Sequence, residues 1–327
     1  MPAHPCHLWL KYLSFPVSSP TKLRPPGSTS FSNSASFRIS VPKRSSVVKK
    51  LRIAPVLTRI LSDLHFDDAT SQVRSLAMLR PLIDGADRII VNGDALDSQV
   101  TARGPELIRE VKTFFAAHTP EALFIAGNHD PDISSVNELL LAGGQIWLTH
   151  GDVFFEYLAP WSPSLPEYRR RIHALRDHLP PVERDRLDTR YRILRAVSIG
   201  LPPEHDPADR SPTHQLARLA RIMVNPRRPL SMIHAWLTSP RTAATMAAQH
   251  HPSARFVIFG HIHHPGVWKK SRHIVINTGS FTPPRGALMV EFDENNLRVR
   301  RIDRRSSAFH PGRIIAEFPL APAPAAP

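Results

Sequence analysis

Five short apolar runs constrain this 327-residue chain more than any other feature, because each leads directly into Asp, His or Asn side chains. The runs are residues 60–61, 89–91, 123–125, 146–148 and 256–259. Runs of this kind, rich in β-branched or aromatic residues and closed by Gly or Asn, predict buried strands. In an open α/β sheet, ligands bind beyond the carboxyl ends of the strands. The polar clusters therefore predict one shared site, which looks dinuclear.

The segments between these runs predict an α/β fold. Approximate helical stripes follow the first two clusters, at residues 73–83 and 107–115, and such β-α-β alternation favours a largely parallel central sheet. Residues 273–277 and 287–292 are predicted strands, and the polar turn after them favours antiparallel pairing. We expect a two-sheet α/β/β/α sandwich with a helical insertion.

The composition divides the chain into a core, an insertion and two tails. Residues 1–54 are basic, rich in Ser and Pro, and free of acidic residues. This composition is similar to that of an organelle transit peptide, although a dispensable tail or a start codon assigned too early are the alternatives. Residues 55–152 and 256–305 form the predicted core. Residues 153–255 form a helical, arginine-rich insertion, expected to cap the site, and residues 306–327 a Pro/Ala-rich C-terminal tail.

Composition excludes several classes of protein. An apolar content of 42% is enough for a packed core. The single cysteine, Cys6, excludes an intramolecular disulfide framework and a thiolate metal cluster. No apolar stretch approaches the roughly 18 residues that a membrane span requires. We therefore predict a cytoplasmic protein, for which peripheral contact with a membrane stays open.

The net charge of +14 is unevenly distributed. Residues 53–152 are rich in acids, which suits a site that concentrates cations, whereas residues 153–255 contain sixteen Arg and no Lys. Arginine recognises phosphate and other anions, so Arg169, Arg170 and Arg171 are candidate substrate-binding residues. The alternative is a solvated helical surface, in which arginines form ion pairs with acids three or four residues away.

The residue types in the clusters indicate divalent metals. Carboxylate, imidazole and amide oxygen suit Mn, Fe, Zn or Co, of which we expect manganese. Two ions about 3.5–4 Å apart can clamp a phosphoryl group and hold a bridging hydroxide. Asp94 is the candidate bridging ligand, because one carboxylate can contact both ions. The other candidate ligands are Asp63, His65, Asn128, His150, His261 and His263.

The order of the motifs carries a resemblance to a known family. The motifs are Asp63-x-His65, Gly93-Asp94-x-x-Asp97, Gly127-Asn128-His129-Asp130, His150-Gly151 and Gly260-His261-x-His263. Each alone has an ordinary explanation as a turn or a solvated loop. Together, and each behind a predicted strand, they resemble the calcineurin-like metallophosphoesterase superfamily over about residues 58–305.

This resemblance implies roles for individual residues. One metal would be held by Asp63, His65, Asp94 and His263, and the other by Asp94, Asn128, His150 and His261. His129 would stabilise the transition state or protonate the leaving oxygen, with Asp130 orienting it. Asp97 and Asp152 would lie behind the ligands and aim them through hydrogen bonds.

We expect a hydrolase that cleaves a phosphate ester or pyrophosphate bond by in-line attack of a metal-bridging hydroxide. Whether it prefers monoesters or diesters stays open. The chain also resembles the UDP-2,3-diacylglucosamine pyrophosphohydrolases. The resemblance lies in the His150-Gly151-Asp152 motif, the insertion near Tyr168 and the Gly260–Pro265 motif. The chain departs from them at His129, where such enzymes often carry Arg. We therefore expect a phosphorylated small molecule or a lipid-linked molecule as substrate.

Two further functions are alternatives. A nuclease acting on a nucleic-acid backbone ranks lower, because aromatic residues suited to base stacking are sparse in the insertion. A non-catalytic metal-binding scaffold would be expected to have lost ligands, and here the full set is present.

Overall fold

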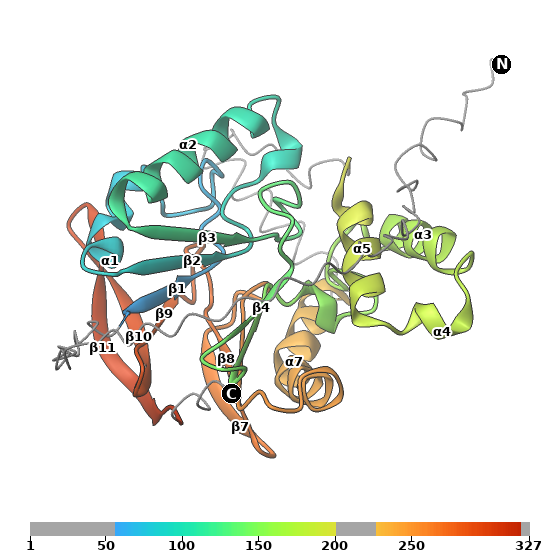
Figure 1. Cartoon of the computed structure of the whole chain (residues 1–327). Helices are drawn as coiled ribbons and strands as arrows, with labels where there is room; N and C mark the ends of the chain where they lie inside the picture. The colour runs from blue at the N-terminus through green and yellow to red at the C-terminus, as the bar shows by residue number, and fades with distance from the viewer. Residues whose placement is uncertain (1–55, 201–226, 322–327) are drawn as a thin grey trace, which may run out of the picture. The chain divides into compact units, whose positions relative to one another are not determined.

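Two β-sheets with helices on their outer faces make up the described part of the chain (Figure 1). The computed structural model describes residues 56–200 and 227–321, which belong to one compact unit, Ile53–Pro327. The α/β/β/α prediction is confirmed. The predicted N-terminal segment 1–54 lies outside the described residues.

The first sheet has six strands in the order β11-β10-β9-β1-β2-β3. Its strands are β1 (Thr58–Leu61), β2 (Arg88–Asn92), β3 (Glu121–Ile125), β9 (Leu288–Phe292), β10 (Asn296–Arg305) and β11 (Ala308–Pro319). Strands β1, β2 and β3 are parallel, whereas β9, β10 and β11 add to β1 in antiparallel fashion. Of the two strands expected to pair in antiparallel fashion, residues 287–292 do so here as β9, whereas residues 273–277 lie in the other sheet, parallel to its strand at Phe256–Phe259.

The second sheet has five strands in the order β4-β5-β6-β8-β7. Its strands are β4 (Glu138–Leu141), β5 (Ile146–Thr149), β6 (Phe256–Phe259), β7 (Gly266–Lys270) and β8 (His273–Asn277). Strands β5, β6 and β8 are parallel, and the edge strands β4 and β7 are antiparallel to their neighbours. The sequence did not predict these two edge strands.

The continuous apolar runs are explained by burial on both faces of each sheet. Along β2, Ile90 faces the cluster between the sheets, whereas Ile89 and Val91 face the cluster under the outer helices. Side chains of a strand alternate between its faces, so a strand covered on both sides must be apolar throughout. Ile60, Ile90 and Ile258 are fully buried where the sheets meet.

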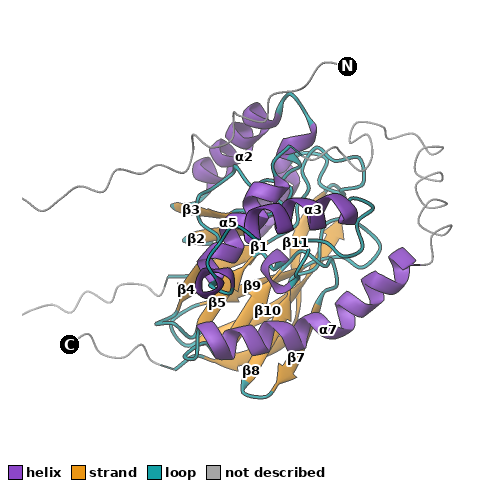
Figure 2. Ribbon diagram, turned by 90° about the vertical axis from the view of Figure 1, so that its right-hand side faces the viewer, coloured by secondary structure: helices purple, strands orange, loops and turns teal. Residues whose placement is uncertain are grey.

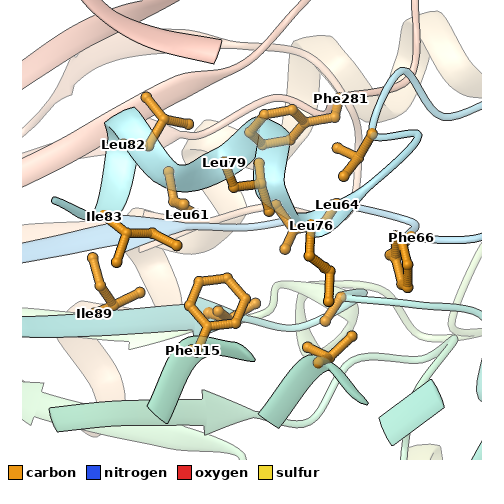
Figure 3. Close-up of a cluster of buried hydrophobic side chains, with 14 of the residues drawn as sticks. Leu61, Leu64, Phe66, Leu76, Leu79, Leu82, Ile83, Ile89, Phe115 and Phe281 are labelled. Carbon is orange, nitrogen blue, oxygen red and sulfur yellow. The ribbon is translucent and has the colours of Figure 1, made fainter. Parts of the chain in front are cut away.

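Two helical segments cover the outer face of the first sheet. They are η2 (Leu76–Leu79) with the short α1 (Arg80–Ile83), and α2 (Gly104–His118). Figure 3 shows Leu79 and Leu82 from the first segment and Phe115 from α2 in one cluster with Leu61. Each buried side chain of this size contributes about 1.5–3 kcal/mol, so the cluster fixes both segments on the sheet.

The insertion supplies the outer layer of the second sheet. Its helices within the described residues are α3 (Leu165–Arg176), α4 (Pro181–Arg184), α5 (Leu187–Ser198) and α7 (Arg227–His250). Because β5 and β6 are parallel neighbours, the chain needs a long crossover between them. Tyr168, Leu194 and Ala243 share one apolar cluster with Val257 and Phe259 of β6. Figure 2 shows α7 lying along this sheet.

One boundary differs from the prediction. Residues 306–327 were expected to be a tail, but β11 occupies Ala308–Pro319 and pairs with β10. The buried Phe309 and the partly buried Phe318 anchor this strand. The sequence did not indicate it, because polar and proline residues surround both phenylalanines. Part of the insertion, residues 201–226, lies outside the described residues, so a helix expected there stays a prediction.

Within residues 56–200 and 227–321, no helix combines the length and the apolar character that crossing a bilayer requires.

Candidate metal centre

Loops from both sheets meet at the carboxyl ends of five strands. Asp63 and His65 follow β1, Asp94 follows β2, Asn128 follows β3, His150 follows β5, and His261 and His263 follow β6. Asn92 Nδ2 at the end of β2 donates to the carbonyl of Thr149 at the end of β5, at 2.8 Å. The amide of His261 donates to Asp63 Oδ1 at 2.9 Å. These hydrogen bonds join the strand ends of the two sheets at one place.

The first group of candidate ligands consists of Asp63, His65, Asp94 and His263, whose ligand atoms all lie within 4.8 Å of one another. His263 Nε2 lies 3.2 Å from Asp63 Oδ1, and His65 Nε2 lies 3.9 Å from Asp94 Oδ2. The Nε2 atoms of His65 and His263 face each other at 3.1 Å. Two imidazole nitrogens that converge in this way, beside two carboxylates, suit a shared cation.

The second group consists of Asp94, His150 and His261, and its ligand atoms lie within the same 4.8 Å limit. His150 Nε2 lies 3.2 Å from Asp94 Oδ2 and 3.1 Å from Asn128 Oδ1, which adds the amide oxygen to the group. His261 Nε2 is 3.0 Å from the carbonyl oxygen of Leu158. Asp94 belongs to both groups, so the structure brings all seven predicted ligands together around one carboxylate.

The backbone at this site adopts conformations that are otherwise avoided. Five of the seven candidate ligands have positive φ angles of 46–67°, namely Asp63, His65, Asp94, His261 and His263. A left-handed conformation costs a residue with a side chain free energy, and such strain is concentrated at functional sites. The strain therefore supports a site that the fold has been selected to hold.

Two glycines let the loops approach the carboxylates. A Cβ atom at Gly127 would lie 2.2 Å from Asp94 Oδ1, and one at Gly260 would lie 2.0 Å from Asp63 Oδ2. No side chain fits at either position without moving a candidate ligand. This explains why Gly precedes the Asn128 and His261 motifs.

The site is closed on one side and open on the other. Asp63, Asp94 and His150 are at most 1% exposed. In contrast, the side chains of His129 and His263 are 42% and 35% exposed. The centre is therefore accessible from the side that these two imidazoles line.

Asp97 contacts the imidazoles of His65 and His129, which is the supporting role that was predicted for it. Its Oδ2 lies 3.1 Å from His65 Nδ1, and its Oδ1 contacts His129 Nδ1. A carboxylate accepts, so both Nδ1 atoms donate to it and both Nε2 atoms are left to face the site.

Asp130 does not have the contact that was expected of it. It was predicted to orient His129, but the structure places Asp97 on that imidazole. Asp130 instead accepts backbone hydrogen bonds from Asp94 at 3.0 Å, Ala95 at 2.7 Å and Gly127 at 2.9 Å. The correction follows from the turn at residues 127–130, which directs the Asp130 side chain inward to the loop after β2.

Charges within the site are strongly coupled. Burial lowers the pKa of His65 and His150, but the neighbouring carboxylates, Asp97 for His65 and Asp94 for His150, raise these pKa values to about 9 and about 10. Burial and His150 lower the pKa of His261 to about 3, so this imidazole is neutral and ready to bind a metal. Burial and the charge of Asp94 raise the pKa of Asp130 to about 8.

The donor set fits divalent cations. Oxygen and imidazole nitrogen donors converge without thiolates, as borderline divalent ions prefer. The neighbouring histidines outweigh the effect of burial and hold the pKa values of Asp63 and Asp94 below the usual range. Both carboxylates therefore supply negative charge in a buried place. Such a site is costly unless cations, here bound protons or metals, compensate it.

Asp152 and the three predicted arginines belong to neither group of candidate ligands. Asp152 begins η4 (Asp152–Phe154), directly after the His150 loop. Arg170 and Arg171 both bind Glu167, with the closest contacts at 2.6 Å, and the guanidinium of Arg169 lies over the ring of Tyr157 at 4.8 Å. The i, i+3 and i, i+4 pairing expected as the alternative is therefore what the structure shows for Arg170 and Arg171.

Sequence reasoning missed residues that support the ligands. Ser62 Oγ donates to Asp63 Oδ2 at 2.5 Å and lies 2.5 Å from Thr278 Oγ1. The carbonyl of Asn92 lies 3.1 Å from His150 Nδ1 and fixes that ring. Each lies next to a motif in the sequence, but polar residues beside a strand end are too common to identify by type alone.

One family of known proteins matches part of the chain. Residues 205–293 match the sequence model of the calcineurin-like phosphoesterase superfamily domain, a span that includes His261 and His263. No curated protein sequence is significantly similar to the chain.

Several solved structures are similar to the chain. One is a predicted phosphoesterase from Streptococcus pneumoniae, with 16% identity, coverage of 82% of this chain and 99% of that chain, and a TM-score of 0.36. A dimetal phosphatase from Danio rerio has 12% identity, coverage of 82% and 99%, and a TM-score of 0.38. A zinc complex of Vps29 from Entamoeba histolytica has 12% identity, coverage of 81% and 99%, and a TM-score of 0.38.

The family match over residues 205–293 confirms the resemblance that the order of the five motifs indicates, to the calcineurin-like metallophosphoesterase superfamily.

Proposed function

We propose that this protein is a dinuclear metal-dependent phosphoesterase, which hydrolyses a phosphate ester or a phosphoanhydride bond. The observation that carries the proposal is the position of Asp94 in both groups of candidate ligands. A shared carboxylate is what two adjacent ions need in order to act on one phosphoryl group. Manganese is the metal we propose first, with iron, zinc and cobalt as alternatives.

The ligand assignment follows the two groups. Asp63, His65, Asp94 and His263 would hold one ion. Asp94, Asn128, His150 and His261 would hold the other. Two bound ions would lower the pKa of a water that attacks phosphorus in line, and would neutralise charge on the phosphoryl group.

His129 is the proposed acid at the open side of the site. The carboxylates of Asp97 and Asp94 outweigh the effect of burial and raise the pKa of His129 well above its usual value, so the imidazole carries a proton. Asp97 holds Nδ1, which leaves Nε2–H as the donor toward the substrate. That proton can stabilise a phosphoryl oxygen or pass to the leaving oxygen.

Hydrolysis of bis-p-nitrophenyl phosphate with added Mn²⁺ tests the proposal. The variant Asp94→Asn is expected to lose turnover and most of its bound metal, measured by elemental analysis. Asp185→Asn is the matched control, because this carboxylate is 81% exposed. Full loading with two ions, but no turnover of a broad panel of phosphoesters, would instead support the non-catalytic scaffold.

A lipid-linked diphosphate, as in the UDP-2,3-diacylglucosamine pyrophosphohydrolases, is the second candidate substrate. It is favoured by exposed apolar residues on one side of α7: Leu230, Ile233 and Leu237 are 63%, 46% and 73% exposed. Their spacing of three and four residues places them on one helix face, where acyl chains could bind. Loss of activity on UDP-2,3-diacylglucosamine but not on bis-p-nitrophenyl phosphate in Leu237→Ser would support it. Equal activity of Leu237→Ser and the unchanged protein on both would contradict it.

A further inference from the structure

Arg285 lies against a stack of planar side chains. Its Cζ atom is 4.1 Å from the ring centroid of Trp236. Trp236 in turn stacks on His264, with centroids 5.0 Å apart and planes at 17°, and His264 stacks on Trp268 at 5.9 Å and 27°. Contacts of this kind between a cation and an aromatic face hold the guanidinium over the ring.

This stack is attached to the candidate metal centre. His264 directly follows the candidate ligand His263 in the chain. Trp236 Nε1 donates to the carbonyl of Ile262 at 2.9 Å, on the other side of His263. Helix α7 therefore holds the stack in register with the loop after β6.

The loop that carries Arg285 is attached to the other end of the same centre. Residues 279–287 form a closed loop, with a bridge between Gly279 and Ala287 and a hydrogen bond from the Ser280 amide to the Gly286 carbonyl at 3.2 Å. The Phe281 amide and Ser280 Oγ both donate to the carbonyl of Asp63, each at 3.1 Å. Arg285 is thus held between two elements that each contact a candidate ligand.

The hydrogen-bonding capacity of Arg285 is unused. Stacking occupies the face of a guanidinium and leaves its N–H donors, which point outward in its plane, open. Within residues 56–200 and 227–321, this exposed side chain donates no hydrogen bond to a carboxylate or carbonyl, and the aromatic ring that it lies over is that of Trp236. Arg170 and Arg171 differ, because both are engaged with Glu167.

We propose that Arg285 determines specificity by binding a second anionic group of the substrate, next to the phosphoryl group at the metals. The substrate class is then a diphosphate, in which two phosphoryl groups are adjacent, rather than a simple phosphate ester. A planar guanidinium matches two oxygens of such a group. The inference rests on the proposed function for the location of the first phosphoryl group.

Ligand binding tests this proposal without turnover. The full chain with Mn²⁺ is titrated calorimetrically with methylenediphosphonate, which carries two phosphonate groups, and with methylphosphonate, which carries one. Arg285→Ala is expected to weaken diphosphonate binding about tenfold or more, as loss of a charged hydrogen bond does, and methylphosphonate binding less than about twofold. Arg241→Ala, which removes an exposed arginine from the same helix as Trp236, is expected to change neither.

Arg285→Lys and Trp236→Leu sharpen the result. Lysine keeps the charge but not the planar fork, so it should restore only part of the diphosphonate affinity. Trp236→Leu removes the platform, and combining it with Arg285→Ala should weaken binding no further than Arg285→Ala alone. Equal weakening of both phosphonates by Arg285→Ala, or no weakening of either, would overturn the proposal.

The outcome is separate from that of the proposed function. A protein that hydrolyses no phosphoester but shows the selective loss of diphosphonate binding would retain the Arg285 site and reject the enzyme. If the protein hydrolyses esters, and its Arg285→Ala variant binds both phosphonates as tightly as the unchanged protein, the enzyme proposal stands and the Arg285 proposal is wrong.

Discussion

Nδ1 of His65 lies 3.1 Å from Oδ2 of Asp97, and the second oxygen of the same carboxylate contacts Nδ1 of His129. One side chain therefore sets the ring orientation of a candidate metal ligand and of the proposed acid together. The charges of both imidazoles outweigh the effect of burial and hold the pKa of Asp97 well below its usual value, so it stays an acceptor. Asp97 thereby joins a candidate metal ligand to the proposed acid.

Replacing Asp97 should affect catalysis more than metal content. We expect Asp97→Asn to lower kcat about 10–100-fold, because an amide cannot accept from both rings and lets them rotate. Bound metal, measured by elemental analysis, should fall less than kcat, since Asp63, Asp94 and His263 still surround the first ion. A variant with unchanged kcat would show that neither ring depends on Asp97.

Replacing His129 should affect poor leaving groups most. His129→Ala is expected to lower kcat about 10²–10⁴-fold for an alkyl phosphodiester, whose leaving oxygen needs a proton. The loss should be much smaller for bis-p-nitrophenyl phosphate, because p-nitrophenolate departs without one. Metal content should be unchanged, since His129 lies in neither group of ligands around Asp94. An equal loss for both substrates would assign His129 to stabilising phosphoryl oxygens instead.

Metal binding should tighten as pH rises. In the metal-free protein, His65 with a pKa of about 9 and His150 with a pKa of about 10 both carry protons at neutral pH. A metal must displace these protons, so affinity should rise by up to about tenfold per pH unit for each proton between pH 6 and 9. Calorimetry in buffers of different ionisation enthalpy should show proton release. Affinity that is independent of pH would contradict the protonated state.

The same protons should stabilise the metal-free protein in a defined range of pH. The folded-state pKa values of His65 and His150 lie above the unfolded value, so their contribution is complete below about pH 6.5 and is lost as pH rises through 9 and 10. In EDTA, thermal unfolding should therefore occur at lower temperature at pH 9.5 than at pH 6.5. The loss should be smaller with saturating Mn²⁺, which takes the place of the protons.

How far the sequence predicts this site depends on how local each relationship is. Asp63, His65 and Asp94 were predictable because each directly follows a strand whose apolar run is visible in the chain. The contact of Asp97 with His129 was not predictable, because it joins two loops whose relative position only the folded sheet determines. The stack of Arg285 on Trp236 joins residues 49 positions apart with no periodic pattern.

The sheet edges show the same limit. Strand β7 (Gly266–Lys270) is half-buried and contains two lysines, so its sequence lacks an apolar run. Strand β11 is anchored by Phe309, while most of its other side chains are exposed or partly exposed. Edge strands have one free side, and their residues follow the demands of solvent more than those of packing.

Adding a methyl group at Gly260 should damage the first ligand group selectively. In Gly260→Ala, the new Cβ would lie 2.0 Å from Asp63 Oδ2 and 2.7 Å from Ser62 Oγ, so the Asp63 carboxylate must shift from its present position. We expect a loss of about 1–3 kcal/mol in unfolding free energy, as for other overpacked sites, and weaker binding of one of two metal ions. Gly85→Ala is the control, because Gly85 has a φ of +81° but nothing within 4 Å of the added Cβ. It should cost only the backbone strain of a left-handed residue and leave metal binding intact. If Gly260→Ala bound two ions as tightly as Gly85→Ala does, metal binding by Asp63 would not depend on the close approach of Gly260 to its carboxylate.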